Sequence, residues 1–444
     1  MLKRKLSNIS ATLLSLACGL SLHGQANTLS DALSVNAASR NTVETSQSQP
    51  NIIYILADDL GYGELGCYGQ EKIETPNIDQ LRSEGVANKQ GFDFFFGYNC
   101  QRQAHTYFPR HLWKNEAKIP LRNQSVAPST RLPEGADPLN EASYANYTLT
   151  DYAPDLMFSE ITNFVDANKA KPFFLYWASP IPHVPLQAPK RWVDHYVKKF
   201  GDEHPHIAGY FPCRSPRATY AAMVSYLDEN VGKLVRQLKE LGIYDNTLIV
   251  FTSDNGPTFN GGSQSSWFNS AGPFNEGRPW GKCTLQEGGV RVPFIATWPG
   301  KIQAGSERDH ISAFWDALPT FCEIAGVTPP EAIDRISYLP ALLQQGDQKD
   351  HEFLYWEYDG TQAVRMGKWK AIRSFQKNKP HMKLFNLEED IREEKNIASA
   401  NPELVSQIET IMKSAAHRTN VRCAADFSSV YCGFKSVIHT LAPI

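Results

Sequence analysis

Two short apolar runs, each followed by acidic or amide residues, constrain the fold of this chain more than any other feature. Residues 52–57 (IIYILA) precede Asp58 and Asp59, and residues 248–253 (LIVFTS) precede Asp254 and Asn255. Continuous apolar runs of this length are typical of strands that are buried on both faces of a parallel sheet. Because ligands of open α/β sheets bind beyond the carboxyl ends of such strands, we expect the two polar pairs to lie close together.

These four side chains offer a set of metal ligands made only of oxygen. Three carboxylates and one amide oxygen favour Ca2+, with Mg2+ second, over zinc. The alternative is that each pair forms an Asx turn that ends its strand. Glycine-rich stretches follow both pairs, at residues 60–63 and 256–257, and favour the metal interpretation.

The alternation of strand and helix patterns predicts an α/β fold, with a mostly parallel central sheet flanked by helices. From about residue 350 the pattern changes, which predicts a small C-terminal α+β subdomain of antiparallel strands. The expected strands are 52–57, 173–178, 248–253 and 292–297, then 353–357, 363–372 and 383–386; the expected helices lie near 154–168, 218–242 and 402–417.

The N-terminus has the pattern of an export signal. Lys3, Arg4 and Lys5 precede an interrupted apolar stretch, and cleavage is expected near Ala26, with Cys18 as an alternative site for a lipid anchor. The stretch is too short and too broken to span a membrane. We therefore expect a periplasmic or secreted protein. The predicted organisation is a signal peptide (1–26), a flexible linker (27–50), a main domain (51–349), the C-terminal subdomain (350–417) and a tail (418–444).

The charge balance excludes one class of partner. The chain has 44 basic and 47 acidic residues, so it carries no overall basic excess for nucleic-acid binding.

Several stretches, in the same order along the chain, resemble the sulfatase family of the alkaline phosphatase superfamily. The resemblance covers most of residues 50–415 and implies a calcium-dependent hydrolase of sulfate esters, acting on a sulfated carbohydrate or an aryl sulfate. The matching stretches are NIIYILADDLGYG (51–63), TPNID (75–79), FFLYW (173–177) with Pro182 and His183, TSDNG (252–256), and GK (281–282) followed by EGGVRVP (287–293).

The resemblance also implies roles for individual residues. Asp58, Asp59, Asp254 and Asn255 would hold Ca2+. As the catalytic groups, Lys282 would bind the sulfate, and His183 would bind it or protonate the leaving oxygen. Gln101, Arg102 and His105 are expected to line the sugar subsite.

The family's nucleophile segment, Cys/Ser-x-Pro-x-Arg, is absent. Its place lies between Val86 and Ala87, where intact flanks meet, which indicates an internal deletion. The Gly-Lys-Trp segment, which follows the nucleophile segment in the family and supplies another sulfate-binding lysine, is absent as well. Two other stretches of the chain resemble these missing segments. Cys213 begins CRSPR, in which proline falls one residue late, and residues 367–370 (GKWK) lie in an expected C-terminal strand; we interpret both as structural.

Without a nucleophile, we expect weak turnover or none, and a gap in the sheet where a central strand is missing. One alternative is a non-catalytic protein that binds sulfated glycans, and another is a decaying gene product that does not fold. A phosphatase of the same superfamily is disfavoured, because no histidine-rich two-metal set is present.

Overall fold

The computed structural model describes residues 49–81, 92–127, 129–277, 280–330, 336–376 and 379–416. The expected signal peptide, nearly all of the linker, the junction between Val86 and Ala87 and the tail lie outside the described residues.

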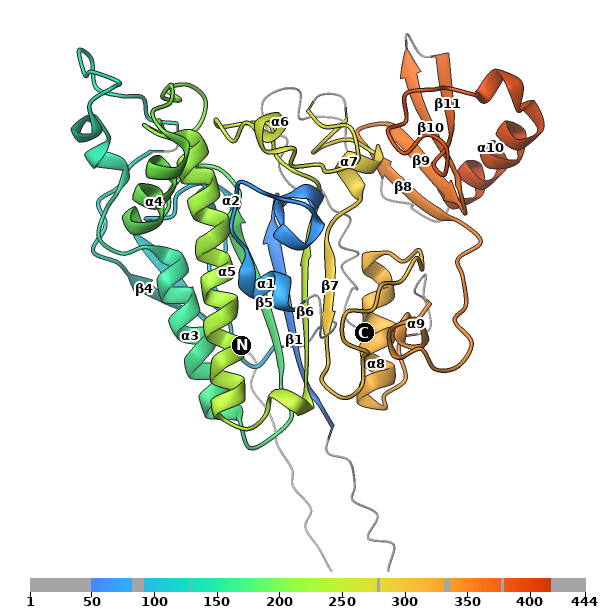
Figure 1. The fold of residues 1–444 in the computed structure, drawn as a ribbon, viewed down its shortest axis with the longest axis horizontal. Helices are drawn as coiled ribbons and strands as arrows, with labels where there is room; N and C mark the ends of the chain where they lie inside the picture. The colour runs from blue at the N-terminus through green and yellow to red at the C-terminus, as the bar shows by residue number, and fades with distance from the viewer. Residues whose placement is uncertain are drawn as a thin grey trace, which may run out of the picture. The chain divides into compact units, whose positions relative to one another are not determined.

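The central sheet consists of four strands in the order β5-β1-β6-β7 (Figure 1). The strands are β1 (Asn51–Asp58), β5 (Phe174–Pro182), β6 (Thr247–Ser253) and β7 (Phe294–Thr297). β1 pairs in parallel with β5 on one side and β6 on the other, and β7 pairs antiparallel to β6. This arrangement confirms the predicted α/β class.

The expected gap in the sheet is wrong for the described strands. Ile53 of β1 pairs with Leu175 of β5 and with Ile249 of β6, so the central strand is hydrogen-bonded along both edges. The strands β5, β1 and β6 are direct neighbours, with no gap between them. β5 and β7 form the edges of the described sheet.

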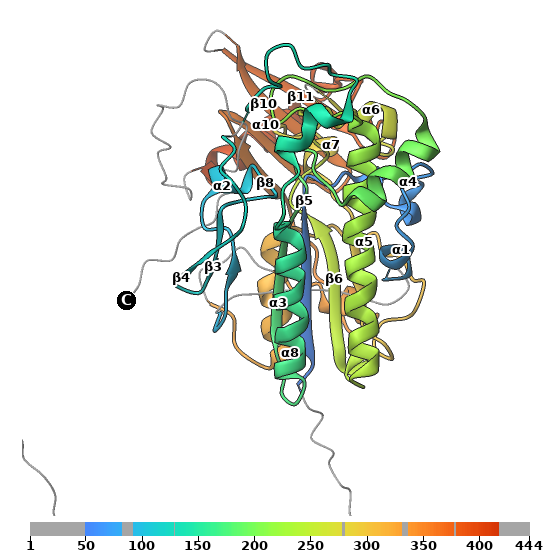
Figure 2. The same cartoon turned by 90° about the vertical axis from the view of Figure 1, so that its left-hand side faces the viewer.

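Alternate residues of β1 enter different cores on the two faces of the sheet. Ile53 and Ile55 pack into a large cluster with α3 (Ala153–Asn168) and α5 (Pro216–Glu240), which run side by side over that face (Figure 2). Ile52 and Tyr54 pack with α8 (Ala317–Ala325) on the opposite face. The two-residue period of a strand explains why a continuous apolar run is needed here.

Helix α5 illustrates how local sequence sets the bounds of an element. Pro216 stands at its first turn, where a missing N–H is tolerated, and Gly242 adopts a φ of 69° just beyond its end. Between them, buried residues recur along nearly the whole helix, including Tyr220 and Leu234.

The C-terminal residues form a separate antiparallel sheet in the order β11-β10-β9-β8, which carries α10 (Pro402–Ala416) on one face. Its strands are β8 (Leu354–Tyr358), β9 (Thr361–Met366), β10 (Trp369–Gln376) and β11 (Lys379–Asn386). The expected strand 363–372 is in fact two strands, because Gly367, with a φ of 53°, turns the chain between β9 and β10. The antiparallel subdomain itself is confirmed.

A third sheet, β2-β3-β4, packs against α3 through Leu112 and Met157. None of the described helices is long and apolar enough to cross a bilayer. The remaining strands are β2 (Phe96–Gly97), β3 (His111–Lys114) and β4 (Ala117–Pro120); the remaining helices are α1 (Pro76–Leu81), α2 (Gln101–Ala104), α4 (Lys190–Phe200), α6 (Ser265–Phe268), α7 (Glu287–Val290) and α9 (Leu339–Leu343); short 3-10 helices span Tyr62–Glu64, Gly66–Tyr68, Glu141–Tyr147, Tyr244–Asn246, Phe314–Asp316 and Ala398–Ala400.

Candidate metal and sulfate site

The two polar pairs meet at the carboxyl end of the central sheet, as the sequence predicts. The parallel register aligns Ala57 with Ser253, so the residues that follow each strand emerge side by side. The backbone N–H of Asp254 donates to the carbonyl of Ala57 (3.2 Å), and the N–H of Asp59 donates to Oδ1 of Asp254 (3.0 Å). Asp59 has a φ of 67°, which turns the chain out of the strand.

Three carboxylate oxygens in this group are buried and accept no hydrogen bond from the described residues: Asp58 Oδ1, Asp59 Oδ2 and Asp254 Oδ2. Burial, together with the neighbouring carboxylates, raises the pKa of Asp58 and of Asp254 well above the ordinary value. A buried polar atom without a partner costs about 1–3 kcal/mol, and more if it is charged. A bound cation would satisfy all three oxygens together.

Asn255 lies within the same group. Its Nδ2 donates to Asp59 Oδ1 (2.9 Å) and to the carbonyl of Gly256 (2.8 Å). In this orientation the amide nitrogen, and not the oxygen, faces Asp59, so the amide would have to turn for its oxygen to face an ion at the carboxylates.

Lys282 supplies the positive charge beside these carboxylates. Its side chain is buried, and its Nζ donates to Asp59 Oδ1. Burial acts to lower the pKa of Lys282, but the charges of Asp59 and Asp58 outweigh it, and the pKa is raised. Lys282 is therefore a buried ammonium ion that faces the predicted metal ligands.

His183 completes the group from the segment that follows β5. Its Nδ1 donates to the carbonyl of Val184, and its Nε2 lies 3.6 Å from Asp59 Oδ2. Burial lowers the pKa of His183, which favours the neutral ring with a bare Nε2. Ligand atoms of Asp58, Asp59 and His183 all lie within 4.8 Å of one another, so these three could hold a metal ion.

Two of the three predicted sugar-subsite residues, His105 and Arg102, differ in their surroundings; the side chain of the third, Gln101, lies outside the described part of the structure. The ring of His105 stacks on that of His183, with centroids 5.5 Å apart and an angle of 9°. Burial and the neighbouring His183 lower the pKa of His105 to about 4. Arg102, by contrast, is exposed on α2, and no hydrogen bond or ion pair found among the described residues connects it with Asp59 or Lys282.

Sequence reasoning missed two residues that support the group. Tyr210 packs edge-on against His105, with ring centroids 5.6 Å apart. Glu64 is buried beneath the loop after β1, where it accepts hydrogen bonds from Gly61 N and Tyr220 Oη. A single tyrosine and a single glutamate carry no spacing signal; the one hint was that Glu64 directly follows the glycine-rich stretch 60–63.

The two imitating stretches are held in structural positions. Cys213 is buried in a β-bridge with His206, and burial raises the pKa of its thiol to about 11. Lys370 is fully buried and forms ion pairs with Glu287 (2.7 Å) and Glu393 (3.4 Å). Neither residue contacts Asp58, Asp59 or Lys282 through a hydrogen bond or ion pair given by the described residues.

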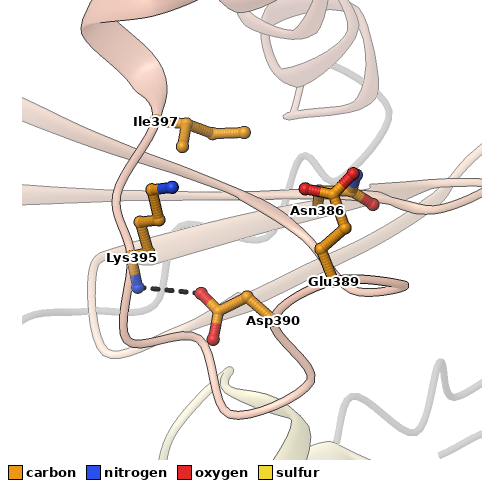
Figure 3. Close-up of a pocket in the computed structure, with 5 residues that line it drawn as sticks. All are labelled: Asn386, Glu389, Asp390, Lys395 and Ile397. Atoms are coloured by element: carbon orange, nitrogen blue, oxygen red, sulfur yellow. Dashed lines mark hydrogen bonds between the residues drawn. The ribbon is translucent and has the colours of Figure 1, made fainter.

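A pocket of about 260 Å³ lies elsewhere, in the C-terminal subdomain, between Asn386, Asp390 and Lys395 (Figure 3). Both carboxylate oxygens of Asp390 accept backbone N–H groups, from Glu394 (3.1 Å) and Lys395 (2.8 Å). The aspartate is thus occupied in closing a turn, and we assign no function to this pocket.

Comparisons with known proteins agree with this geometry. A family model described as Sulfatase matches residues 86–327, more than half of the chain. A second, described as the C-terminal part of N-sulphoglucosamine sulphohydrolase, matches residues 276–420.

Similar proteins and structures carry sulfatase names. Human N-acetylgalactosamine-6-sulfatase is 26% identical over 407 residues, covering 72% of this chain and 71% of that protein. An N-acetylgalactosamine-6-O-sulfatase of Bacteroides thetaiotaomicron is 25% identical over 507 residues (84% and 94%). The crystal structure of Ps i-CgsB superimposes with a TM-score of 0.64 at 25% identity, covering 83% of this chain and 93% of that one. This chain belongs to the sulfatase family.

Proposed function

We propose that this protein is exported, holds a calcium ion at the end of its central sheet, and binds the sulfate group of a sulfated carbohydrate with weak turnover or none. One observation carries the proposal. Three buried carboxylate oxygens accept no hydrogen bond from the described residues, and the ammonium of Lys282 donates to Asp59, one of the same carboxylates, so the group could bind a divalent cation and an anion together.

The donor set fits calcium. Asp58, Asp59, Asp254 and Asn255 would hold the ion through oxygen, and hard oxygen ligands favour Ca2+, ahead of Mg2+. When bound, the ion would draw electron density from the oxygens of the sulfate group. The imidazole nitrogen Nε2 of His183 lies 3.6 Å from Asp59 Oδ2.

Residues of the chain itself supply the remaining chemistry. Lys282 would neutralise one sulfate oxygen from a site that excludes most water, which strengthens the attraction. His183 can donate to a sulfate or to a leaving oxygen only with a proton on Nε2, because Nδ1 already donates to Val184. His105 forms a wall beside it, while exposed Arg102 is expected to reach the sugar.

The weak turnover follows from the missing nucleophile. Removing a nucleophile from a concerted catalytic set lowers kcat by about a millionfold and leaves about a thousandfold acceleration over water. Two findings favour residues missing from this chain, and we propose the junction between Val86 and Ala87 as their place. The family match begins at residue 86, although the stretch 51–63 also resembles the family, and the alignment with the Bacteroides protein is longer than this whole chain of 444 residues.

Relatives suggest the substrate class. They include enzymes named for N-acetylgalactosamine 6-sulfate and an ulvan-active sulfatase of Formosa agariphila. We therefore propose a sulfated carbohydrate as the natural ligand and an aryl sulfate as a convenient probe. Export follows from the predicted signal peptide (1–26), with Cys18 as the alternative lipid-anchored start; N-terminal sequencing of the mature protein distinguishes these two starts and, if Met1 is retained, contradicts export.

The second candidate is a pseudoenzyme that binds sulfated glycans and never releases product. The same observation favours it, since the carboxylates and Lys282 need no nucleophile in order to bind an anion. Single-turnover analysis separates the two: trace desulfation that disappears in Lys282→Met supports a weak hydrolase, and bound, unaltered sugar supports the pseudoenzyme.

The test combines binding and turnover. N-acetylgalactosamine 6-sulfate is titrated into the full-length protein by calorimetry in excess calcium, and 4-nitrophenyl sulfate hydrolysis is followed in parallel. We expect binding that Lys282→Met abolishes and the exposed control Lys368→Met retains, with turnover near background. Turnover typical of an intact sulfatase would refute the proposed inactivity, and absence of binding would refute the site. Resequencing the coding region across Val86 and Ala87 tests the deletion itself.

A further inference from the structure

A buried cluster of charges joins the C-terminal sheet to the turn that carries Lys282. Glu287, at the start of α7, is only 2% exposed and lies five positions after Lys282. Its Oε1 accepts from Lys370 Nζ of β10 (2.7 Å), and its Oε2 accepts from Arg365 Nη1 of β9 (2.9 Å). Its backbone N–H donates to Glu393 Oε2 (2.7 Å), from the segment after β11. The C-terminal sheet therefore holds this turn by its side chain and by its backbone.

The same turn is pressed against the loop of the predicted metal ligands. Gly256, which directly follows Asn255, donates its N–H to the carbonyl of Gly289 (2.9 Å). A Cβ atom on Gly256 would lie 1.9 Å from the carbonyl oxygen of Gly288, so the two backbones touch without room for a side chain. The contacts thus run without a break from the C-terminal sheet to Asn255.

A second contact leads from the metal-ligand loop to Lys282 itself. The N–H of Lys282 donates to the carbonyl of Pro257 (3.4 Å), and its Nζ donates to Asp59. A shift of the turn at Glu287 would therefore move both the ammonium ion and the backbone that follows Asn255.

The chemistry of the cluster favours positioning over stability. Two carboxylates, Glu287 and Glu393, face the cations Lys370 and Arg365, and the more exposed Arg291 lies 3.5 Å from Glu287 Oε2; Lys370 is 0% exposed. Buried ion pairs of this kind contribute little net stability compared with apolar residues of the same volume, because each charge loses its hydration. What they do provide is a single allowed geometry, since any displacement leaves a buried charge unpaired.

We propose that Glu287 and Lys370 are positioning residues, which fix the turn so that Lys282 meets Asp59 and the bound sulfate. The inference rests on the proposed sulfate-binding function and deepens it. It gives Lys370, the buried residue of the GKWK stretch, a role in positioning the site.

The experiment compares Lys370→Met with the matched control Lys368→Met. Lys368 lies two residues away, its side chain is 40% exposed, and its surface pair with Glu388 is 3.5 Å long. Inorganic sulfate is titrated by calorimetry into each full-length protein, in calcium excess and well below both melting temperatures. We expect sulfate affinity to fall by about tenfold or more in Lys370→Met, within the usual range of coupling between sites, and to stay unchanged in Lys368→Met.

A second variant tests the inference in case Lys370→Met loses binding through misfolding. Glu287→Gln keeps the size of the side chain and removes its charge, and we expect it to weaken sulfate binding in the same direction. A lower melting temperature with unchanged sulfate affinity in both variants overturns the inference, because a purely stabilising cluster behaves in that way.

Failure of the proposed function is a distinguishable result. If neither the wild-type protein nor Lys282→Met shows binding heat with sulfate, the proposed function is overturned. Hydrogen exchange of residues 281–291 then decides the inference: faster exchange in Lys370→Met than in Lys368→Met supports the positioning of the turn, and equal exchange overturns it.

Discussion

Replacing Lys282 by methionine should destabilise the protein by an amount that depends strongly on calcium. The Lys282 ammonium is bonded to Asp59, whose side chain is 0% exposed, and Asp58 and Asp254 lie beside it. Among the described residues, Lys282 is the cation bonded to this group of carboxylates. Methionine has a similar length and leaves no large cavity, so the variant removes mainly the charge.

The expected magnitude follows from the burial of the pair. Removing one partner of a buried ion pair costs about 3–5 kcal/mol, because it leaves an uncompensated buried charge. A bound calcium ion supplies two positive charges at the same carboxylates and takes over this neutralisation. Calcium stabilises the wild type as well, so the loss shrinks only by the extra calcium affinity that the variant gains when the competing ammonium is removed. We therefore expect the variant to lose about 3–5 kcal/mol without calcium and a smaller amount with it.

Urea unfolding of the wild type, Lys282→Met and Lys368→Met, each with a chelator and with calcium excess, measures the effect. The exposed control should change by less than about 0.5 kcal/mol in both conditions. An equal loss for Lys282→Met with and without calcium would show that the ion and the lysine do not share the carboxylates, and the reasoning would be refuted.

Three further changes test other parts of the structure. Burial raises the pKa of Glu64 to about 7, so the folded state keeps a proton that the unfolded state loses above its ordinary pKa of 4.5. The free energy of unfolding of the wild type should therefore fall by about 3 kcal/mol relative to that of Glu64→Gln as the pH rises from about 5 to about 8. Parallel pH profiles of the two proteins in urea unfolding would contradict this. Cys213→Ala should leave sulfate affinity and turnover unchanged. Peptide mass analysis of the wild type should find an unmodified cysteine at position 213, and formylglycine there would contradict the structural interpretation. Gly256→Ala places a Cβ 1.9 Å from the carbonyl oxygen of Gly288 and should destabilise by about 1–3 kcal/mol or more, with loss of calcium-dependent stabilisation; a wild-type response to calcium would contradict the close contact.

The central sheet was predictable because its signals are local and periodic. The apolar run of β1 supplies Ile53 and Ile55 to one core and Ile52 and Tyr54 to the other, so only a strand buried on both faces satisfies it. Neighbouring parallel strands also end at the same edge, which is why two distant acidic pairs could be expected to meet.

Other features depend on contacts between distant residues. Lys370 pairs with Glu287, 83 positions away, and no local sequence pattern around either residue predicts this contact. The turn at Gly367 was not predicted, because the residues on both sides of it have the pattern of one continuous strand. Tyr210 lacked any periodic signal, and its place beside His105 emerges only from the packing of the loop.

Calcium binding tests the central claim most directly. Calorimetric titration of calcium into chelator-stripped, full-length protein should show one ion per chain, and Asp59→Asn and Asp254→Asn should each abolish the binding heat while the protein remains folded. No binding heat under calcium excess, or the same heat in both variants, would contradict the account.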